Sequence, residues 1–215
     1  QLAEYYAKNN FRVIGCSRND TGLIFDNYQH FCLDVCDEKE VKKMFSQIRK
    51  THGYLHVLIN NAGIASMNHA LLTTVDTVKK ILNTNVLGPF LFCREAAKLM
   101  QRNKYGRIVN FGSVATPLKL EGEAIYASSK AAVINLTEIL ARELADMGIT
   151  VNAIGPTPVK TDLIKSVPEN KLNQILNRQA IHRFGDFHDI TNVIDFFIKP
   201  ESGFITGQII YLGGI

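Results

Sequence analysis

Short apolar runs rich in β-branched residues alternate along the chain with stretches whose apolar residues recur every three or four positions. Continuous apolar runs of this kind predict buried strands. They are RVIGCS (12–17), FCLDV (31–35), HVLINNAG (56–63), RIVNFGS (107–113), ITVNAIG (149–155) and QIIYLGG (208–214). Because these runs are apolar on both faces, they are typical of a parallel sheet that is covered on both sides.

The stretches between these runs predict helices. Residues 41–50 place their apolar side chains at helical spacing, and longer helical patterns follow at 74–100, 127–144 and 191–199. Strands that alternate with helices predict an α/β protein with one doubly wound parallel sheet and helices on both faces. No linker, composition shift or internal repeat divides the chain, so we expect a single domain over residues 1–215.

Composition and charge narrow the function classes. Hydrophobic residues make up 46% and charged residues 20% of the 215, which are globular proportions. The net charge of +4 comes from scattered lysines and arginines, which favours a solvated surface over a nucleic-acid-binding face. No apolar run approaches the ~18 residues of a membrane span, and the start QLAEYYAKNN has no leader-like core. A cytoplasmic protein is therefore expected.

The cysteines and histidines show no paired metal-ligand spacing, so we assign no metal site. The cysteines are instead expected to be small core residues in a reducing compartment. They are Cys16, Cys32, Cys36 and Cys93.

Small and polar residues follow the predicted strands. In doubly wound sheets, ligands bind outside the carboxyl ends of the strands. Each of these segments alone is also compatible with an ordinary turn, but all five together predict a ligand site. The segments are CSRND (16–20), LDVCD (33–37), NNAGIAS (60–66), NFGSVAT (110–116) and AIGPTPVKTD (153–162).

Tyr126 and Lys130 lie four residues apart on a predicted helix and thus on one face. A phenol titrates near 10, and a neighbouring ammonium lowers that pKa and makes the tyrosine a usable proton donor or acceptor. Ser113 precedes Tyr126 by thirteen residues. The same Tyr–Lys spacing also occurs by chance in surface helices, where both side chains are solvated.

Taken in order, these motifs resemble the short-chain dehydrogenase/reductase family, and most of all its carrier-protein ketoacyl reductase branch. The resemblance covers nearly the whole chain and implies a Rossmann-like sheet. The matching segments are NNAG (60–63), NTNVLGPF (83–90), RIVNFGSVA (107–115), YASSK (126–130), VNAIGPTPVKTD (151–162) and ITGQIIYLGG (205–214).

The resemblance implies four catalytic residues. Ser113 would hold and polarise the reacting carbonyl oxygen, while Tyr126 would give it a proton, or take one in the direction of alcohol oxidation. Lys130 would lower the pKa of Tyr126 and bind the nicotinamide ribose. Asn85, in the segment NTNVLGPF, would hold a water that links Lys130 to solvent.

NADP(H) is favoured over NAD(H) as the cofactor. Dinucleotide folds that use NAD carry an acid after the second strand, whereas this chain has Ser17 and Arg18 there. An arginine suits a 2′-phosphate, although Arg18 is also compatible with a solvated loop. Asp34 and Val35 would flank the adenine. The expected cofactor-binding residues are Ser17, Arg18, Asp34, Val35, Asn61, Ala62, Gly63, Tyr126, Lys130, Pro156, Val159 and Thr161.

The sequence departs from the family pattern in three places. Thr157 replaces a glycine beside the expected nicotinamide site, and Leu212 replaces an aspartate. The family's first strand and glycine-rich phosphate loop have no counterpart, so that the predicted sheet lacks its first strand. We therefore expect an upstream segment of roughly 20–25 residues in the natural protein.

The sequence says less about the substrate and the partners than about the catalytic residues. Residues 163–184 fall at the family's substrate loop. They carry four basic residues: Lys165, Lys171, Arg178 and Arg183. These side chains could contact an acidic carrier protein or a phosphopantetheine phosphate, and they are equally compatible with a solvated surface. The leading hypothesis is NADPH-dependent reduction of a ketone, with an acyl carrier protein- or CoA-linked β-ketoacyl thioester as first candidate.

Two alternatives stay open. One is an NAD(P)-dependent dehydrogenase of a sugar, polyol or other secondary alcohol. The other, from a different class, is a non-catalytic relative that senses NADP(H) or binds a partner. The helices that follow Asn85 and Tyr126 indicate a homotetramer by family resemblance, with a dimer next.

Overall fold

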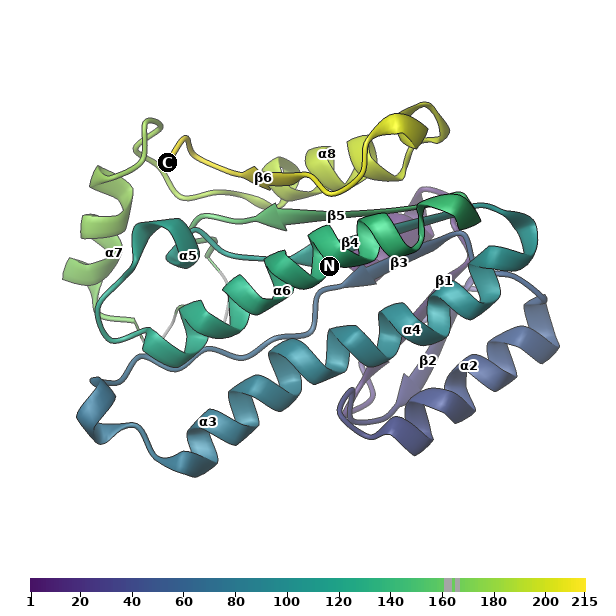
Figure 1. The fold of residues 1–215 in the computed structure, drawn as a ribbon, viewed down its shortest axis with the longest axis horizontal. Coiled ribbons are helices and arrows are strands. Elements are labelled where there is room, and N and C mark those ends of the chain that lie inside the picture. The colour runs from purple at the N-terminus through teal and green to yellow at the C-terminus, as the bar shows by residue number, and fades with distance from the viewer. Residues whose placement is uncertain (161–163, 165–166) are drawn as a thin grey trace.

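The computed structural model describes residues 1–160, 164 and 167–215 (Figure 1). Its strands are all paired in parallel, and helices flank them, which confirms the α/β prediction. They form a two-stranded and a four-stranded sheet with the orders β1-β2 and β3-β4-β5-β6. The strands are β1 (Val13–Ser17), β2 (Tyr28–Cys32), β3 (Val57–Asn60), β4 (Gly106–Phe111), β5 (Ile149–Gly155) and β6 (Ile209–Tyr211).

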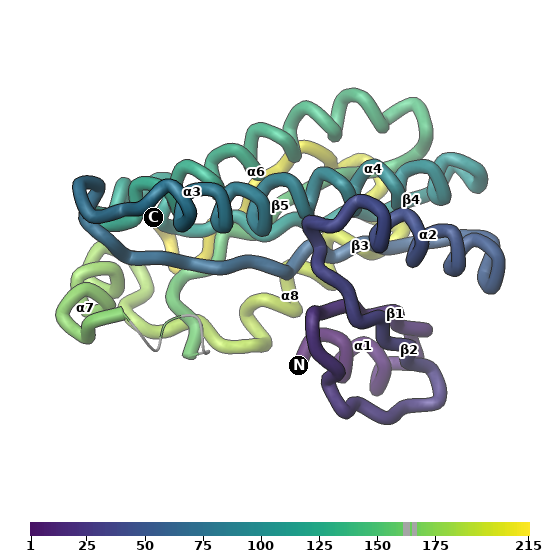
Figure 2. Tube along the Cα trace, turned by 90° about the horizontal axis from the view of Figure 1, so that it is seen from below, coloured from purple at the N-terminus to yellow at the C-terminus, as the bar shows by residue number. Residues whose placement is uncertain are grey.

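Helices cover both faces of the strands, as predicted, and Figure 2 shows these layers from the side. α2, α4 and α6 pack on one face and α8 on the other, the face that α1 also joins. The helices are α1 (Leu2–Lys8), α2 (Glu38–His52), α3 (Val75–Leu82), α4 (Gly88–Met100), α5 (Ala115–Leu118), α6 (Ala124–Glu143), α7 (Glu169–Asn177) and α8 (Phe187–Ile198). None of the helices in the described ranges is both long and apolar enough to cross a membrane.

The alternation of side chains along β4 supplies both halves of the core. Ile108 packs into the cluster that contains α2, α4 and α6, whereas the next residue, Val109, packs into the cluster with Ile194 and Phe197 of α8. Successive strand residues point to opposite faces, so an unbroken apolar run is what a doubly covered strand requires.

The two sheets are not joined into one, and the gap lies between β1 and β3. In the part of the chain that the structure describes, β1 and β3 share no ladder hydrogen bonds. A cavity of about 540 Å³ lies there instead, lined by residues of both strands such as Ile14, Cys16, Leu58 and Ile59. This is the place where the sequence-based hypothesis puts a further strand, and that hypothesis stays a prediction.

A polar contact ties the first helix to the last. The hydroxyls of Tyr5 and Tyr6 on α1 donate to the two carboxylate oxygens of Asp195 on α8, at 2.7 and 2.9 Å. The contact holds α1 against the face that α8 covers. Figure 2 shows α1, β1 and β2 together at one side of the layer formed by the other strands.

Candidate functional site

The four predicted catalytic residues come from three separate segments and lie in the interior. Ser113 follows β4, Tyr126 and Lys130 lie in the first two turns of α6, and Asn85 lies in a π-helical turn, η2 (Asn83–Leu87), between α3 and α4. Their exposed fractions range from 0% for Asn85 to 8% for Ser113 and Tyr126. The alternative of a solvated surface pair is therefore wrong for Tyr126 and Lys130.

Lys130 is held against the end of β4. Its Nζ donates a hydrogen bond of 2.7 Å to the carbonyl of Phe111 and lies 6.0 Å from the centre of the Tyr126 ring. Burial lowers the pKa of Lys130 to about 8, since a desolvated ammonium is disfavoured. Lys130 therefore titrates close to neutral pH.

The structure does not bear out the expected lowering of the tyrosine pKa. Burial raises the pKa of Tyr126, the nearby Ser113 hydroxyl opposes this, and the carboxyl of Glu123 adds to the rise. The ammonium of Lys130 donates to a backbone carbonyl, and the pKa of Lys130 is itself lowered. Both features weaken the lowering of the Tyr126 pKa that a neighbouring positive charge would cause. At neutral pH Tyr126 is thus a protonated phenol, the form that a proton donor requires.

Hydrogen bonds hold both the oxygen and the nitrogen of the Asn85 side-chain amide. Its Oδ1 accepts from the backbone N–H of Ile64, and its Nδ2 donates to the carbonyl of Ile64 and to Oγ of Ser129, each at 2.9 Å. Oγ of Ser129 in turn donates to the carbonyl of Tyr126 at 2.7 Å. The π turn that carries Asn85 is a feature often found at functional sites.

The predicted cofactor residues gather around two cavities that meet. The larger cavity between the sheets is lined by Ser17, Arg18, Asp34, Val35, Asn61, Ala62 and Gly63. A second cavity of about 210 Å³ is lined by Ser113, Tyr126, Lys130, Pro156 and Val159. Asn61 and Gly63 line both, so the two cavities adjoin at the loop after β3. Thr161 lies outside the described residues.

Charge and shape in this region fit a dinucleotide cofactor. Arg18 stands near Asp34, whose pKa is lowered first by the backbone N–H of Cys36 and also by the positive charge of Arg18. At Gly63 the chain passes close to the catalytic side chains, where the missing Cβ leaves room for a ligand. Across residues 1–160, 164 and 167–215, no three His, Cys, Asp or Glu side chains gather where they could hold a metal ion.

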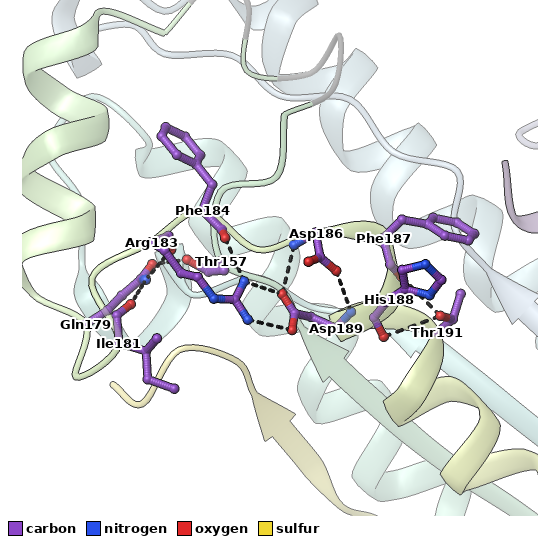
Figure 3. A network of polar contacts seen from close by, with 10 residues as sticks. All are labelled: Thr157, Gln179, Ile181, Arg183, Phe184, Asp186, Phe187, His188, Asp189 and Thr191. Carbon is purple, nitrogen blue, oxygen red and sulfur yellow. Dashed lines mark hydrogen bonds and ion pairs between the residues drawn. The ribbon is translucent and has the colours of Figure 1, made fainter.

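Thr157 takes part in a contact that the family's glycine could not make. Its hydroxyl donates to Oε1 of Gln179, whose Nε2 donates to the carbonyls of Ile181 and Arg183, at 2.9 and 3.1 Å (Figure 3). Gln179 and Thr157 are both buried, with exposed fractions of 2% and 6%. The loop after β5 is therefore fastened to the segment between α7 and α8.

The same network continues into α8. The guanidinium of Arg183 makes two hydrogen bonds of 2.6 and 2.8 Å to the carboxylate of Asp189 (Figure 3). Asp189 and Asp186 form a reciprocal capping box at the start of α8. A chain of contacts thus runs from the predicted nicotinamide side of the site to a helix on the opposite face of the sheet.

Sequence reasoning missed three residues of the site: Glu123, Ser129 and Gln179. The first has a local signal, because it stands three residues before Tyr126 and thus on the same helical face. Ser129 adjoins Lys130, but nothing in the sequence indicates its contact with Asn85. Gln179 meets Thr157 across 22 residues, and no local pattern predicts that contact.

Comparisons with known proteins agree with this geometry over nearly the whole chain. A family model described as enoyl-(acyl carrier protein) reductase matches residues 2–214. The 3-oxoacyl-(acyl-carrier-protein) reductase FabG of Vibrio cholerae is 30% identical over 219 residues, which cover 99% of this chain and 90% of that protein.

Solved structures give the same result. ElxO with bound NADP superposes with a TM-score of 0.89 at 32% identity, over 98% of this chain and 90% of its own. A 4-hydroxyisoleucine dehydrogenase complexed with NADH superposes with a TM-score of 0.88 at 29% identity, over 99% and 91%. The likeness therefore covers the fold over nearly the whole chain, not one motif.

Proposed function

Because the chain belongs to the short-chain dehydrogenase/reductase family, we propose that it reduces a ketone to a secondary alcohol with NADPH. The family makes it an NAD(P)-dependent oxidoreductase that acts on CH–OH or C=O groups. The observation that carries the proposal is the buried set of Ser113, Tyr126 and Lys130 in one cavity, next to a second cavity lined by Arg18.

The residues divide the work of the reaction between them. Bound NADPH supplies the hydride that the carbonyl carbon accepts. Ser113 donates a hydrogen bond to the carbonyl oxygen as negative charge develops on it. Tyr126 then transfers its phenolic proton to that oxygen, and its raised pKa keeps the phenol protonated at neutral pH for this step. The proton would be replaced from solvent through Lys130 and a water held at Asn85.

The first candidate substrate is a β-ketoacyl thioester linked to acyl carrier protein or CoA. A similar protein, FabG of Vibrio cholerae, is named as a reductase of such a carrier-bound substrate. Of the basic residues around the expected substrate segment 163–184, Arg183 is already paired with Asp189, and Lys171 lies 3.9 Å from Glu121. Arg178, which is exposed, is better placed to meet an acidic carrier.

Oxidation of a secondary alcohol such as a polyol is the second candidate. A putative gluconate dehydrogenase and a 4-hydroxyisoleucine dehydrogenase are among the similar structures, and both names indicate polar substrates. The unpaired carboxyl of Glu123 in the smaller cavity favours a substrate of this kind.

NADP(H) is proposed over NAD(H) because Arg18 lines the larger cavity and suits a 2′-phosphate. Similar structures hold NADP in one case and NADH in another, so this preference rests on Arg18.

We further propose one domain over residues 1–215 and a homotetramer. Ile139 on α6 and Phe90 on α4 are exposed apolar side chains suited to a subunit contact, whereas Leu140 and Leu144 belong to the core.

The test is oxidation of NADPH, followed by absorbance at 340 nm, with a panel of β-ketoacyl thioesters, simple ketones and hydroxy ketones. Turnover with NADPH that exceeds turnover with NADH supports the proposal. No absorbance change with any member of the panel, together with measurable binding of a protein partner, would instead support the non-catalytic alternative.

A further inference from the structure

A carboxyl group that the proposed mechanism does not use lies in the smaller cavity. Glu123 occupies the N-cap position of α6, and its side chain lines the cavity together with Ser113 and Tyr126. Its Oε2 is shielded from solvent and has no hydrogen-bond partner among the described residues. Burial raises the pKa of this carboxyl to about 7.

The position at the helix start does not explain this side chain. An N-cap carboxylate ordinarily accepts a hydrogen bond from a backbone N–H two or three residues on. Glu123 makes no such bond: its backbone carbonyl accepts from Ala127 at 2.7 Å, but its side chain does not cap α6. Oε2 of this carboxyl therefore has no partner on α6.

The cavity wall offers no partner for that oxygen. Much of it is apolar, with Val114, Leu120, Val159, Leu172 and Ile175. Lys130 is the cation among the described lining residues, and its Nζ already donates to the carbonyl of Phe111. A carboxyl without a partner is unfavourable in such a wall, so a ligand that donates a hydrogen bond to it binds better than an otherwise identical ligand that does not.

We propose that Glu123 determines specificity by accepting a hydrogen bond from a hydroxyl or ammonium group that the substrate carries near its reacting carbonyl. The inference rests on the proposed carbonyl reduction. The Glu123 carboxyl contributes to the raised pKa of Tyr126 and lines the same cavity, so the donor lies only a few bonds from the carbonyl held at Ser113 and Tyr126. An unsubstituted alkyl ketone would leave this carboxyl unpaired, which a site built for hydrogen bonding rejects.

Matched ketones test this directly. The probes are 2-pentanone, 4-hydroxy-2-butanone and 4-(dimethylamino)-2-butanone, which is cationic at neutral pH. Dissociation constants are measured by ligand-observed NMR titration of the enzyme saturated with NADP⁺, where no reduction takes place. The variants are Glu123→Gln and Glu123→Leu, and Glu121→Gln is the control because that side chain is 94% exposed. Circular dichroism confirms that each variant is folded.

Wild type is expected to bind 4-hydroxy-2-butanone at least about tenfold more tightly than 2-pentanone, the factor that corresponds to ~1.4 kcal/mol. Glu123→Leu brings this ratio close to one, and Glu121→Gln leaves it unchanged. Glu123→Gln retains part of the hydroxyl preference, because an amide oxygen also accepts, but loses any preference for the cation. This last comparison shows whether the preferred donor is a hydroxyl or an ammonium group.

Two results overturn the role of Glu123. One is that wild type binds the hydroxy ketone no more tightly than 2-pentanone, or not measurably. The other is that the preference for the hydroxy ketone survives in Glu123→Leu. The kcat/KM values for the same probes with NADPH separate this failure from failure of the proposed function. A binding preference without turnover of any ketone leaves the role of Glu123 standing and rejects the reductase. Turnover of all three ketones at equal kcat/KM supports the reductase and rejects the role of Glu123.

Discussion

Oδ1 of Asn85 and Nζ of Lys130 face the same point in the structure: a Cβ added to Gly63 would lie 3.5 Å from each. The two atoms come from η2 and α6, and Gly63 lies in the loop after β3. An acceptor and a cation that border one small space are suited to hold a water between them. That water is what the proposed return of a proton to Tyr126 requires.

Gly63→Ala is expected to lower kcat by about tenfold while leaving the fold intact, because the methyl group fills the space that a water would use. A separation of 3.5 Å is an ordinary van der Waals contact, and φ at Gly63 is not positive, so the free energy of unfolding changes by less than about 1 kcal/mol. Steady-state kinetics and thermal denaturation measure the two effects. A large loss of stability, or unchanged kcat, would contradict a water at this point.

Arg18→Ala is expected to raise KM for NADPH by about ten- to a hundredfold and to leave KM for NADH nearly unchanged, since a charge-assisted hydrogen bond to the 2′-phosphate is worth about 1.5–3 kcal/mol. The measurement is the ratio of kcat/KM for the two cofactors. Arg49→Ala is the matched control, because Arg49 is an exposed arginine on α2. Equal effects on both cofactors would show that Arg18 does not read the 2′-phosphate.

The raised pKa of Glu123 makes a prediction about stability and pH. The folded carboxyl has a pKa of about 7 against an ordinary 4.5, so between these values the folded protein binds more protons than the unfolded chain. The favourable contribution is present below about pH 4.5 and is lost as the pH rises through about 7. Glu123→Gln, which stays neutral, is therefore expected to raise Tm relative to wild type at pH 8 and to have little effect at pH 5. An equal difference in Tm at both pH values would contradict the shift.

Gln179→Leu leaves the hydroxyl of Thr157 and the carbonyls of Ile181 and Arg183 without their partner. We expect it to lower the free energy of unfolding by about 1–3 kcal/mol, measured by urea denaturation. Gln174→Leu, at an exposed position of α7, is the control. Adding Thr157→Val to Gln179→Leu should restore part of the loss, because both partners are then apolar. A purely additive loss would show that the two side chains act independently.

Much of the fold could be predicted from the sequence, because its elements depend on local patterns. The run RIVNFGS gave β4 since both Ile108 and Val109 are apolar and each faces its own core. The sequence also predicted a sheet without its first strand, and the structure has a cavity between β1 and β3. Local patterns do not report the register in which neighbouring strands share hydrogen bonds.

The candidate site was predictable in its members but not in its electrostatics. The spacing of Tyr126 and Lys130 placed both on one face of α6, yet the sign of the tyrosine pKa shift depends on burial and on where Nζ points. The sequence indicated neither the burial of Tyr126 nor the carbonyl of Phe111 that receives the ammonium. The bond between Thr157 and Gln179 joins distant segments and likewise needs the tertiary structure.

The most direct test of the central claim is the rate of ketone-dependent NADPH oxidation in wild type and in Tyr126→Phe. The account predicts turnover in wild type and a kcat about 10²- to 10⁴-fold lower in the variant, with a much smaller change in the dissociation constant for NADPH, because the proton donor is removed while the other cofactor-binding residues stay. An undiminished kcat in Tyr126→Phe would contradict the account.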